Sequence, residues 1–233
     1  MRTIYSDFTI IIPTLNEARI IGGVVAGIVQ LYPEISVVVA DDDSVDGTAD
    51  IVNKLSQKNK RVKLIVRKNK TRGLTASIID ALNEIKTKYF IVMDGDGQHP
   101  PEKVKEMVDD LRAGNHIVVA CRTNVHGWAL HRRLISLGAS TLGKIFLTAQ
   151  VAPLCGDILS GFFGMKTEFA KQVIQKNRAR FVDGGYKFLY DFLKCLQKDT
   201  RIGESGYVFG MREGGTSKIG LGHYFLFVKS LLS

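Results

Sequence analysis

The sequence predicts an α/β fold in which helices cover both faces of a mostly parallel central sheet. Short runs of β-branched residues recur along the first half of the chain, and they lack the apolar–polar alternation of strands with one exposed face. Segments with the apolar spacing of helices separate these runs. A strand followed by a helix, repeated along the chain, is typical of βαβ units and therefore of a parallel sheet.

The expected elements follow one another from the start of the chain. In the first half, strands are expected at residues 8–12, 37–39, 62–66, 90–93 and 116–120, with helices at residues 20–31, 49–55, 74–85 and 104–111 between them. In the second half, we expect a helix at 130–147, apolar turns at 158–165, a helix at 186–196 and a short strand at 207–211. No internal repeat or clear linker divides the chain, so one domain is predicted over residues 1–218.

Residues 219–233 are expected to form an amphipathic helix at the end of the chain. Six apolar residues fall at i, i+3, i+4, i+7, i+10 and i+11, which lie on one helical face: Leu221, Tyr224, Phe225, Val228, Leu231 and Leu232. Such a face either anchors the helix at a membrane interface or packs on the core of its own domain. The sequence leaves both alternatives open.

The composition fits a globular protein with an anionic partner. The chain has 233 residues, of which 45% are hydrophobic and 24% charged, and this balance argues against a disordered or fibrous protein. The net charge of +9 favours a nucleic acid, an acidic membrane surface or a phosphorylated substrate as partner. No recognised nucleic-acid-binding module accompanies that charge, so nucleic acid is disfavoured.

The chain as given is expected to be soluble or peripheral to a membrane, in a reducing compartment. No stretch reaches the roughly 18 apolar residues that a spanning helix needs, and residues 1–7 lack the features of a signal peptide. The cysteines, Cys121, Cys155 and Cys195, are far apart in the sequence and form no Cys-x-x-Cys pair. They therefore indicate neither a disulfide framework nor a zinc site.

The strongest local signal is the motif Asp94-Gly95-Asp96-Gly97-Gln98 at the end of a predicted buried strand. If the backbone stays extended, Asp94 and Asp96 point to the same side, because side chains alternate along a strand. Two converging carboxylates repel each other unless a cation lies between them, and Mg²⁺ or Mn²⁺ binds one or two carboxylates together with substrate phosphates. The alternative is a solvated turn, in which Asp-x-Asp is common.

Polar loops also follow the first and second predicted strands. The first strand ends in Pro13-Thr14-Leu15-Asn16-Glu17, and Asp41-Asp42-Asp43-Ser44 follows the second. Ser44 or Asp46 is expected to cap the next helix, whereas Asp41 or Asp42 is a candidate acceptor for the donor edge of a nucleobase. Ligands of open α/β sheets bind outside the carboxyl ends of the strands, so these loops and the acidic motif predict one shared site. The first loop is no Gly-x-Gly-x-x-Gly turn, which disfavours an NAD-dependent Rossmann enzyme.

An ordered set of motifs extends over nearly the whole chain. The first half contains Ile12-Pro13-Thr14-Leu15-Asn16-Glu17, Asp41-Asp42-Asp43-Ser44 with Asp46-Gly47-Thr48, Arg72-Gly73-Leu74, and Asp94-x-Asp96-x-Gln98-His99-Pro100-Pro101-Glu102. The second half contains Arg122, Arg132-Arg133-Leu134-Ile135-Ser136, Asp157-x-x-Ser160-Gly161-Phe162-Phe163, Tyr186-Lys187, and Phe209-Gly210-Met211-Arg212-x-x-Gly215-x-Ser217-Lys218. This set resembles the inverting glycosyltransferases of family 2, which have the GT-A fold, and within them the dolichyl-phosphate (polyprenyl-phosphate) mannose synthases.

The resemblance implies a role for each site residue. The nucleotide pocket would be lined by Pro13, Leu15, Glu17, Ala40 and Asp42. The donor diphosphate and a Mg²⁺ or Mn²⁺ ion would be held by Asp94, Asp96 and Gln98, with Gly95 also at the donor. The acceptor phosphate would be received by Arg122, Arg132 and Ser136, while the donor would be covered by Arg212 and Lys218. The implied catalytic set is Asp96, Arg122, Arg132 and Ser136.

The chain departs from the family's pattern in two places. Leu15 stands where the first motif has an aromatic residue, so stacking of the base on this position loses its support. Gly95 and Gly97 stand where the acidic motif has bulkier residues, which either loosens the motif or alters the sugar pocket.

The activity implied by the resemblance is transfer of mannose from GDP-mannose to a dolichyl or polyprenyl phosphate. It would take place at the cytoplasmic face of a membrane, by a peripheral protein, with or without a membrane subunit as partner. The alternatives are a family 2 enzyme that uses a UDP-sugar, for instance a dolichyl-phosphate glucosyltransferase, and a non-catalytic nucleotide-binding subunit.

General chemistry agrees with the implied transfer. A divalent cation can stabilise the departing diphosphate as a Lewis acid. An acceptor phosphate has a second pKa of about 6, so it needs orientation more than deprotonation. The guanidinium groups of Arg122, Arg132 and Arg212 would supply that orientation, and no dedicated general base is expected.

Overall fold

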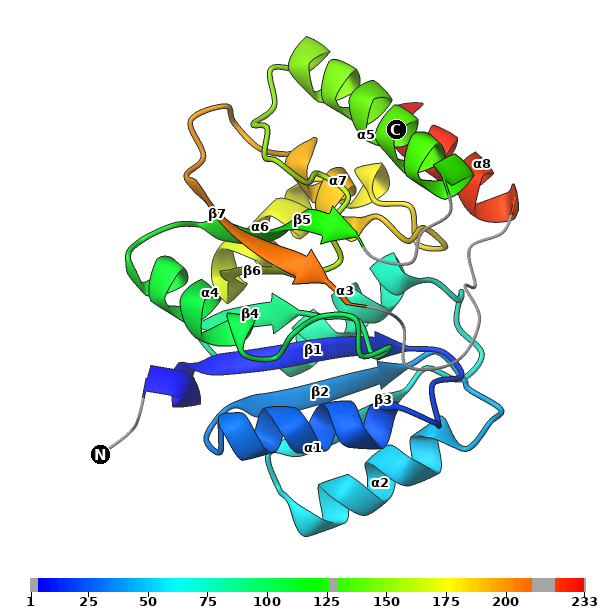
Figure 1. Cartoon of the computed structure of the whole chain (residues 1–233), viewed down its shortest axis with the longest axis vertical. Helices are drawn as coiled ribbons and strands as arrows, with labels where there is room; N and C mark the ends of the chain where they lie inside the picture. The colour runs from blue at the N-terminus through cyan, green and yellow to red at the C-terminus, as the bar shows by residue number, and fades with distance from the viewer. Residues whose placement is uncertain (1–3, 126–129, 211–220, 233) are drawn as a thin grey trace.

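The structure is a computed structural model that describes residues 4–125, 130–210 and 221–232, with side chains described for residues 4–123, 135–210 and 225–231. Its centre is a seven-stranded sheet in the order β3-β2-β1-β4-β6-β5-β7 (Figure 1). The strands are β1 (Phe8–Thr14), β2 (Ser36–Asp41), β3 (Val62–Val66), β4 (Tyr89–Val92), β5 (Ile117–Val125), β6 (Phe163–Lys166) and β7 (Ile202–Phe209). β6 runs antiparallel to its neighbours β4 and β5, and the other neighbouring strands pair in parallel. The predicted mostly parallel sheet is confirmed.

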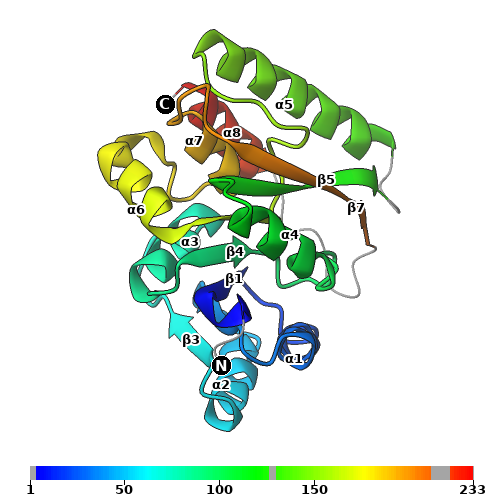
Figure 2. The ribbon, with the colours of Figure 1, turned by 90° about the vertical axis from the view of Figure 1, so that its left-hand side faces the viewer.

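Helices cover both faces of this sheet (Figure 2). They are α1 (Ile21–Leu31), α2 (Thr48–Lys58), α3 (Leu74–Glu84), α4 (Lys103–Arg112), α5 (Leu130–Ala149), α6 (Thr167–Lys176), α7 (Phe188–Leu193) and α8 (Leu221–Leu232), with 3-10 turns at Ile4–Asp7 and Arg178–Arg180. Ile10 and Ile12 pack in the core shared with α1 and α4, whereas Ile11 packs in the core shared with α3, α6 and α7. Burial of both faces explains the uninterrupted apolar runs of the central strands.

The region after residue 158 differs from the expectation. Apolar turns are predicted at 158–165, but the segment ends in the strand β6, and the unpredicted helix α6 follows directly. β6 has only four residues. Inside it, a Cβ atom on Gly164 would lie 3.0 Å from a side-chain carbon of Ile91 and 3.0 Å from one of Leu111. Neighbours far away in the sequence therefore fix this strand, and its own residues carry no clear strand pattern.

β7 is longer than predicted. It begins at Ile202 and ends at Phe209, whereas the sequence predicts a strand at 207–211. Gly203 and Gly206 lie in the part that the prediction misses, and glycine is depleted in strands. Parallel pairing along β5, from Ile117 opposite Ile202 onward, establishes the strand instead.

The carboxyl ends of β1, β2, β4 and β5 point toward one edge of the sheet (Figure 1). The loops after β1, β2 and β4 are the three polar segments singled out in the sequence. The topology therefore brings them to one place, as expected for a ligand site in an open α/β sheet.

The terminal helix α8 packs on the domain through a face that differs from the predicted one. Phe227, Ser230 and Leu231 are buried, and only Leu231 belongs to the predicted apolar face. Phe225 and Val228, which also belong to that face, are 73% and 48% exposed. The packed face is rotated relative to the prediction, so apolar side chains remain on the outer side of the helix. None of the helices in the described part of the chain is both long and apolar enough to cross a bilayer.

Candidate functional site

Hydrogen bonds across the sheet edge tie the loop after β1 to the loop after β2. The backbone N–H of Asn16 donates to Ser44 Oγ (2.8 Å), and the N–H of Val45 donates to Asn16 Oδ1 (2.9 Å). The N–H of Ala18 donates to Asp46 Oδ2 (2.9 Å). Asn16 adopts a φ of 53°, a left-handed conformation that asparagine tolerates better than most residues. The two polar loops thus form one continuous surface.

Two aspartates after β2 have structural roles. Asp46 Oδ1 accepts from the backbone N–H (3.0 Å) and the hydroxyl (2.6 Å) of Thr48, the first residue of α2. The N-cap residue of α2 is Gly47 and no side chain caps the helix, so the prediction that Ser44 or Asp46 is the cap is wrong. Burial acts to raise the pKa of Asp46, but its hydrogen bonds outweigh burial and lower that pKa. Asp41 is fully buried, and its carboxylate accepts from the hydroxyls of Thr14 (3.2 Å) and Ser44 (2.6 Å). Asp41 therefore joins the loops rather than facing a ligand.

A buried arginine and a backbone amide hold Asp42. Asp42 Oδ1 accepts from the guanidinium of Arg67, and Oδ2 accepts from the N–H of Gly73 (2.6 Å). Arg67 is buried and also donates to Asp80 Oδ2 (2.8 Å) and to the carbonyl of Thr71 (3.0 Å). Burial raises the pKa of Asp42, although Gly73 and Arg67 act to lower it. Arg67 belongs to none of the sequence motifs, yet it sets the orientation of the carboxylate predicted to contact the nucleotide.

The acidic motif leaves the sheet after β4 as a turn. The backbone does not stay extended through the motif, because Gly95 and Asp96 lie in a turn, so strand alternation does not apply to Asp94 and Asp96. Both carboxylates are close enough to Tyr207 on β7 to influence its pKa. Burial is the largest cause of the raised pKa of Tyr207 on β7, and Asp94 and Asp96 both contribute to it. The N–H of Gln98 donates to Asp96 Oδ1 (3.1 Å) and closes the turn.

A buried histidine, His99, supports this turn. His99 Nδ1 accepts the backbone N–H of Asp94 (3.0 Å), and the ring stacks on Phe162 with 4.9 Å between centroids. Burial lowers the pKa of His99 to about 4, so the ring is neutral near pH 7 and carries its proton on Nε2. Nε2 lies 3.6 Å from Asp94 Oδ2. His99 thus fixes the backbone of Asp94 without adding a positive charge beside it.

Two glycines allow the turn to pack closely. A Cβ atom on Gly161 would lie 2.9 Å and 3.1 Å from the two carboxylate oxygens of Asp94. A Cβ atom on Gly95 would lie 2.9 Å from Thr14 Cγ2 and 3.3 Å from Ile12 Cγ2. Gly95 therefore brings the turn into close contact with β1, where a bulkier residue would have to displace the strand's side chains. A ligand contact by Gly95 would come from its backbone.

The turn offers oxygen donors that fit a hard divalent cation. In the described residues, no group of three or more His, Cys, Asp or Glu side chains is arranged to hold a metal. Asp94 and Asp96 supply two carboxylates and Gln98 an amide oxygen, and substrate phosphate or water completes such a set for Mg²⁺ or Mn²⁺.

The Gln98 side-chain amide donates to the carbonyl of Gly210 (2.8 Å), and the N–H of Gly210 donates to the carbonyl of Gln98 (3.2 Å). These bonds join the turn to the end of β7.

Arg122 on β5 is oriented by Asp157. Its Nε and Nη2 atoms donate to Asp157 Oδ2 (2.6 Å) and Oδ1 (2.9 Å), which makes the pair bidentate. Burial acts to lower the pKa of Arg122, but the pairing outweighs it and raises that pKa. Burial likewise acts to raise the pKa of Asp157, and Arg122 lowers it overall. The guanidinium also lies 5.7 Å from the ring centroid of Phe209. Asp157, which the sequence marks only as part of a motif, therefore fixes this arginine.

A comparison with protein families identifies the family of the chain. The model of the family described as glycosyl transferase family 2 matches residues 9–174. The chain belongs to glycosyl transferase family 2. The matched region includes the loops after β1 and β2, the acidic turn, and both Arg122 and Asp157.

Two similar proteins both bear the name dolichol-phosphate mannosyltransferase. The protein from Pyrococcus furiosus is 32% identical over 220 residues, which cover 91% of this chain and 58% of that protein. The protein from Mycosarcoma maydis is 32% identical over 189 residues, which cover 78% of this chain and 60% of that protein. The chain thus spans about three fifths of the length of these relatives.

A solved structure shares the fold. Glucosyl-3-phosphoglycerate synthase from Mycobacterium tuberculosis, in complex with Mn²⁺, UDP-glucose and phosphoglyceric acid, superposes with a TM-score of 0.68 at 17% sequence identity. The match covers 98% of this chain and 80% of that chain. Together with the family 2 match, it confirms the GT-A type of α/β domain that the sequence predicts.

The predicted nucleotide-binding residues of the family 2 domain lie at the carboxyl ends of β1 and β2. Pro13, Leu15 and Glu17 are half-buried at the end of β1 and in the loop after it. Ala40 pairs with Pro13 across the two strands and is fully buried in the core. The structure therefore gathers these positions near Asp42.

The structure describes only part of the residues predicted to receive the acceptor phosphate or to cover the donor. Ser136 is half-buried on α5, the helix that also carries Arg132. The side chain of Arg132 lies outside the described residues, as do Arg212 and Lys218 altogether. Their roles remain predictions from the sequence.

Proposed function

We propose that this protein transfers mannose from GDP-mannose to a dolichyl or polyprenyl phosphate, with a divalent cation at Asp94 and Asp96. The observation that carries the proposal is the 32% identity to two dolichol-phosphate mannosyltransferases over most of this chain. The acidic turn and the oriented Arg122 agree with it, because both stand at the sheet edge where a phosphorylated ligand would bind.

The donor side of the proposed reaction depends on the three polar loops. When bound, the cation would supply Lewis-acid stabilisation of the negative charge on the departing diphosphate. Asp94, Asp96 and Gln98 would hold it, with His99 and Gly161 keeping Asp94 in place. Asp42 would contact the nucleotide from the loop after β2, and the proposal assigns Pro13, Leu15, Glu17 and the backbones of Ala40 and Gly95 to the same pocket.

The acceptor side depends on Arg122 and its partner. The acceptor phosphate is largely ionised near neutral pH, so the protein has to orient it rather than remove a proton. Asp157 holds the guanidinium of Arg122 in one orientation before any ligand binds, which reduces the entropy lost on binding. In the proposal, Arg132 and Ser136 complete the phosphate site, and Arg212 and Lys218 cover the donor.

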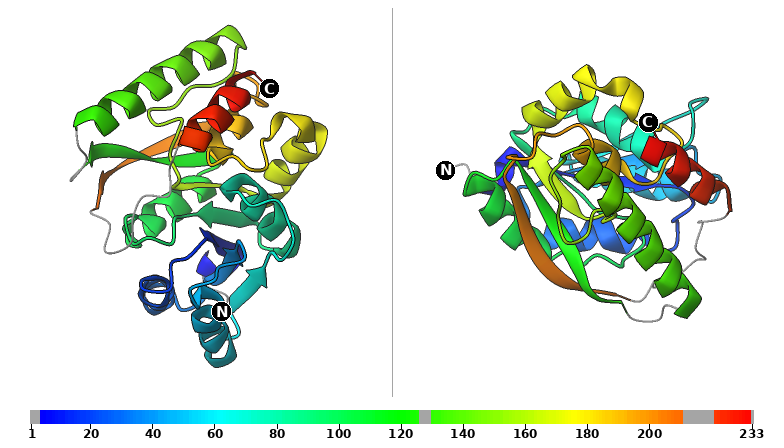
Figure 3. Two further views of the ribbon diagram at one scale, coloured as in Figure 1. Left: turned by 90° about the vertical axis from the view of Figure 1, so that its right-hand side faces the viewer. Right: turned by 90° about the horizontal axis from the view of Figure 1, so that it is seen from above.

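The outer surface of α5 and α8 supports a peripheral position on a membrane. The two helices lie side by side at the end of the domain opposite β3 (Figures 1 and 3). Between Ile135 and Ala149, Lys144 is the single charged residue of α5. Apolar side chains that are 42–73% exposed gather on these helices: Ile135, Leu137, Leu142, Ile145, Phe225 and Val228. With a net charge of +9, this surface suits an anionic bilayer, which we propose to be a cytoplasmic face.

A vesicle flotation experiment tests the membrane surface. Wild-type protein should float with vesicles of phosphatidylcholine and phosphatidylserine, and Phe225→Glu and Ile145→Glu should stay at the bottom of the gradient. Leu31→Glu is the matched control, because Leu31 is 47% exposed on α1, away from α5 and α8 (Figure 1). Equal flotation of all variants would show that α5 and α8 do not meet the bilayer.

A panel of sugar nucleotides tests the transfer itself. Purified protein with Mn²⁺ and a polyprenyl phosphate should make labelled lipid from GDP-mannose, and Asp96→Asn should abolish the product. Asp109→Asn, an exposed carboxylate on α4, should leave it unchanged. Transfer from UDP-glucose alone would replace mannose by glucose in the proposal. Nucleotide binding without any transfer would favour the non-catalytic subunit.

A further inference from the structure

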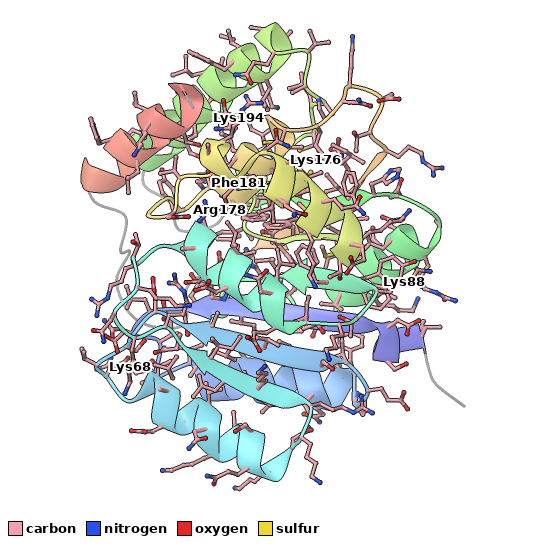
Figure 4. All side chains as sticks on the ribbon, turned by 180° about the vertical axis from the view of Figure 1, so that it is seen from behind. Lys68, Lys88, Lys176, Arg178, Phe181 and Lys194 are labelled. Carbon is pink, nitrogen blue, oxygen red and sulfur yellow. The ribbon has the colours of Figure 1, made fainter. Side chains whose placement is uncertain are left out.

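A fully buried ion pair, of which Figure 4 labels Lys194, lies outside the site described above, where α7 meets α8. Lys194 Nζ is 2.9 Å from Asp191 Oδ1, and the two side chains are 0% and 1% exposed. Lys194 Nζ also donates to the carbonyl of Ser230 on α8 (2.5 Å) and to the carbonyl of Arg180 (3.2 Å). The hydroxyl of Ser230 donates to Asp191 Oδ1. We call Asp191, Lys194 and Ser230 the latch, because they fasten α8 to the domain.

Burying the two charges of the latch costs free energy, which their mutual attraction and their hydrogen bonds offset. Burial raises the pKa of Asp191 and lowers the pKa of Lys194, and each charge acts to offset the shift of the other. A buried pair of this kind is weak evidence for stability, whereas removing one partner leaves an uncompensated buried charge. Ser230 supplies both a hydroxyl and a carbonyl to the pair, so two hydrogen bonds join α8 to α7 at this residue.

The second carboxylate oxygen of Asp191 holds the turn at residues 182–185. Asp191 Oδ2 accepts the backbone N–H of Val182 (3.1 Å), and the N–H of Gly185 donates to the carbonyl of Val182 (2.8 Å). Leu226 of α8 borders the same turn, because a Cβ atom on Gly184 would lie 3.8 Å from Leu226 Cδ1. Asp191 and α8 thus hold this turn from two sides.

Backbone carbonyls of residues 182–185 accept hydrogen bonds from the start of α3. The N–H of Thr75 donates to the carbonyl of Gly185 (3.1 Å), and the N–H of Ala76 donates to the carbonyl of Asp183 (3.3 Å). These carbonyls satisfy backbone donors that a helix start otherwise leaves unpaired, and no side chain caps α3. A Cβ atom on Gly73 would lie 2.2 Å from the carbonyl oxygen of Asp183, so only glycine allows this approach.

We propose that Asp191 and Ser230 are positioning residues for the nucleotide pocket. They act through the turn at 182–185 and the start of α3, and they thereby hold the hydrogen bond from Gly73 to Asp42 in place. The bond from the Gly73 N–H to Asp42 Oδ2 is 2.6 Å long and ends this series of contacts. The inference rests on the proposed function, in which Asp42 contacts the nucleotide. The proposal links the packing of α8, the helix proposed to meet the membrane, to the affinity of the protein for the donor.

The variant Ser230→Ala tests the proposal, since it removes the hydroxyl and keeps both charges. It should weaken binding of GDP with Mn²⁺ by about two- to thirty-fold, the range in which mutations along a coupled network act. The KM for the donor should rise to the same extent with kcat unchanged, because a pocket residue far from the reacting atoms affects binding alone. Ser230→Thr, which keeps the hydroxyl, should restore the affinity, and Lys229→Ala on the exposed side of α8 should leave it unchanged.

Hydrogen exchange separates positioning from a general loss of stability. In Ser230→Ala, amide exchange should become faster at residues 73–76 and 182–185 and should stay unchanged in β1 and β4. Faster exchange throughout the domain, or unchanged exchange at 73–76, would overturn the inference. Normal affinity of Ser230→Ala for GDP would overturn this inference and leave the proposed function intact. A wild-type protein that binds no nucleotide would overturn both.

Discussion

The hydroxyl of Tyr207 is buried and has no hydrogen-bond partner within the described residues. An unpaired buried polar group costs about 1–3 kcal/mol. Tyr207→Phe keeps the ring contacts with His99 and Phe162, so it should raise the free energy of unfolding of the ligand-free protein by about 1 kcal/mol. Urea denaturation measures this change. A less stable variant would mean that the hydroxyl is paired in solution.

His99 should make the stability of the metal-free protein depend on pH. Its pKa is about 4 in the folded protein, against 6.5 for an unperturbed histidine. Between these values the unfolded chain binds a proton that the folded chain does not, so the free energy of unfolding rises with pH. The difference is about 3 kcal/mol, fully present above pH 6.5 and lost as the pH falls toward 4.

The variant His99→Phe checks this pH dependence. Phenylalanine can keep the stack on Phe162 but has no titrating group. Unfolding measured from pH 4 to pH 7 should therefore show a flatter profile for His99→Phe than for the wild type. Identical profiles would show that His99 does not remain neutral in the folded protein.

At the scale of elements, the acidic turn after β4 depends on the loop that leads into β6. Gly161→Ala would place a methyl group 2.9 Å from one carboxylate oxygen of Asp94, so the carboxylate should swing away. Affinity for Mn²⁺ in the presence of GDP should fall by about 10- to 100-fold, as for other residues that support metal ligands. Gly23→Ala on α1 is the control, since its Cβ atom would meet nothing within 4 Å. Equal affinities would contradict this account of Gly161.

The elements that the sequence predicts well are those whose residues face one environment along their whole length. β1, β2 and β4 are buried on both faces, so most of their residues are apolar. β6 and β7 could not be predicted as well, because pairing with β4 and β5 forms them and glycines interrupt them. The face of α8 also differs, since its sequence carries more apolar residues than its packing on the domain requires.

The site residues that the sequence could indicate are those that directly follow buried strands. Asp94, Asp96 and Asp42 follow buried strands, and the topology of a parallel sheet brings strand ends together. Their supporting residues are distant in the sequence: Arg67 is 25 positions from Asp42, and Asp157 is 35 positions from Arg122. Such partners leave no local pattern, so only the folded chain identifies them.

At the scale of the whole molecule, the domain has a polar edge and an apolar end. The loops after β1, β2 and β4 form the edge, and the outer sides of α5 and α8 form the end. The latch and the turn at 182–185 connect the two through hydrogen bonds and through the backbone at the start of α3. In the proposed function this arrangement places the donor at the edge while the apolar end faces the bilayer that carries the acceptor.

The central claim is that Asp94 and Asp96 hold a divalent cation together with the leaving nucleotide. Electron paramagnetic resonance of Mn²⁺ tests it most directly. With GDP present, the wild-type protein should bind one Mn²⁺ ion, and Asp94→Asn and Asp96→Asn should each bind it much more weakly. Unchanged Mn²⁺ binding in both variants, or no binding to the wild type with GDP, would contradict the account.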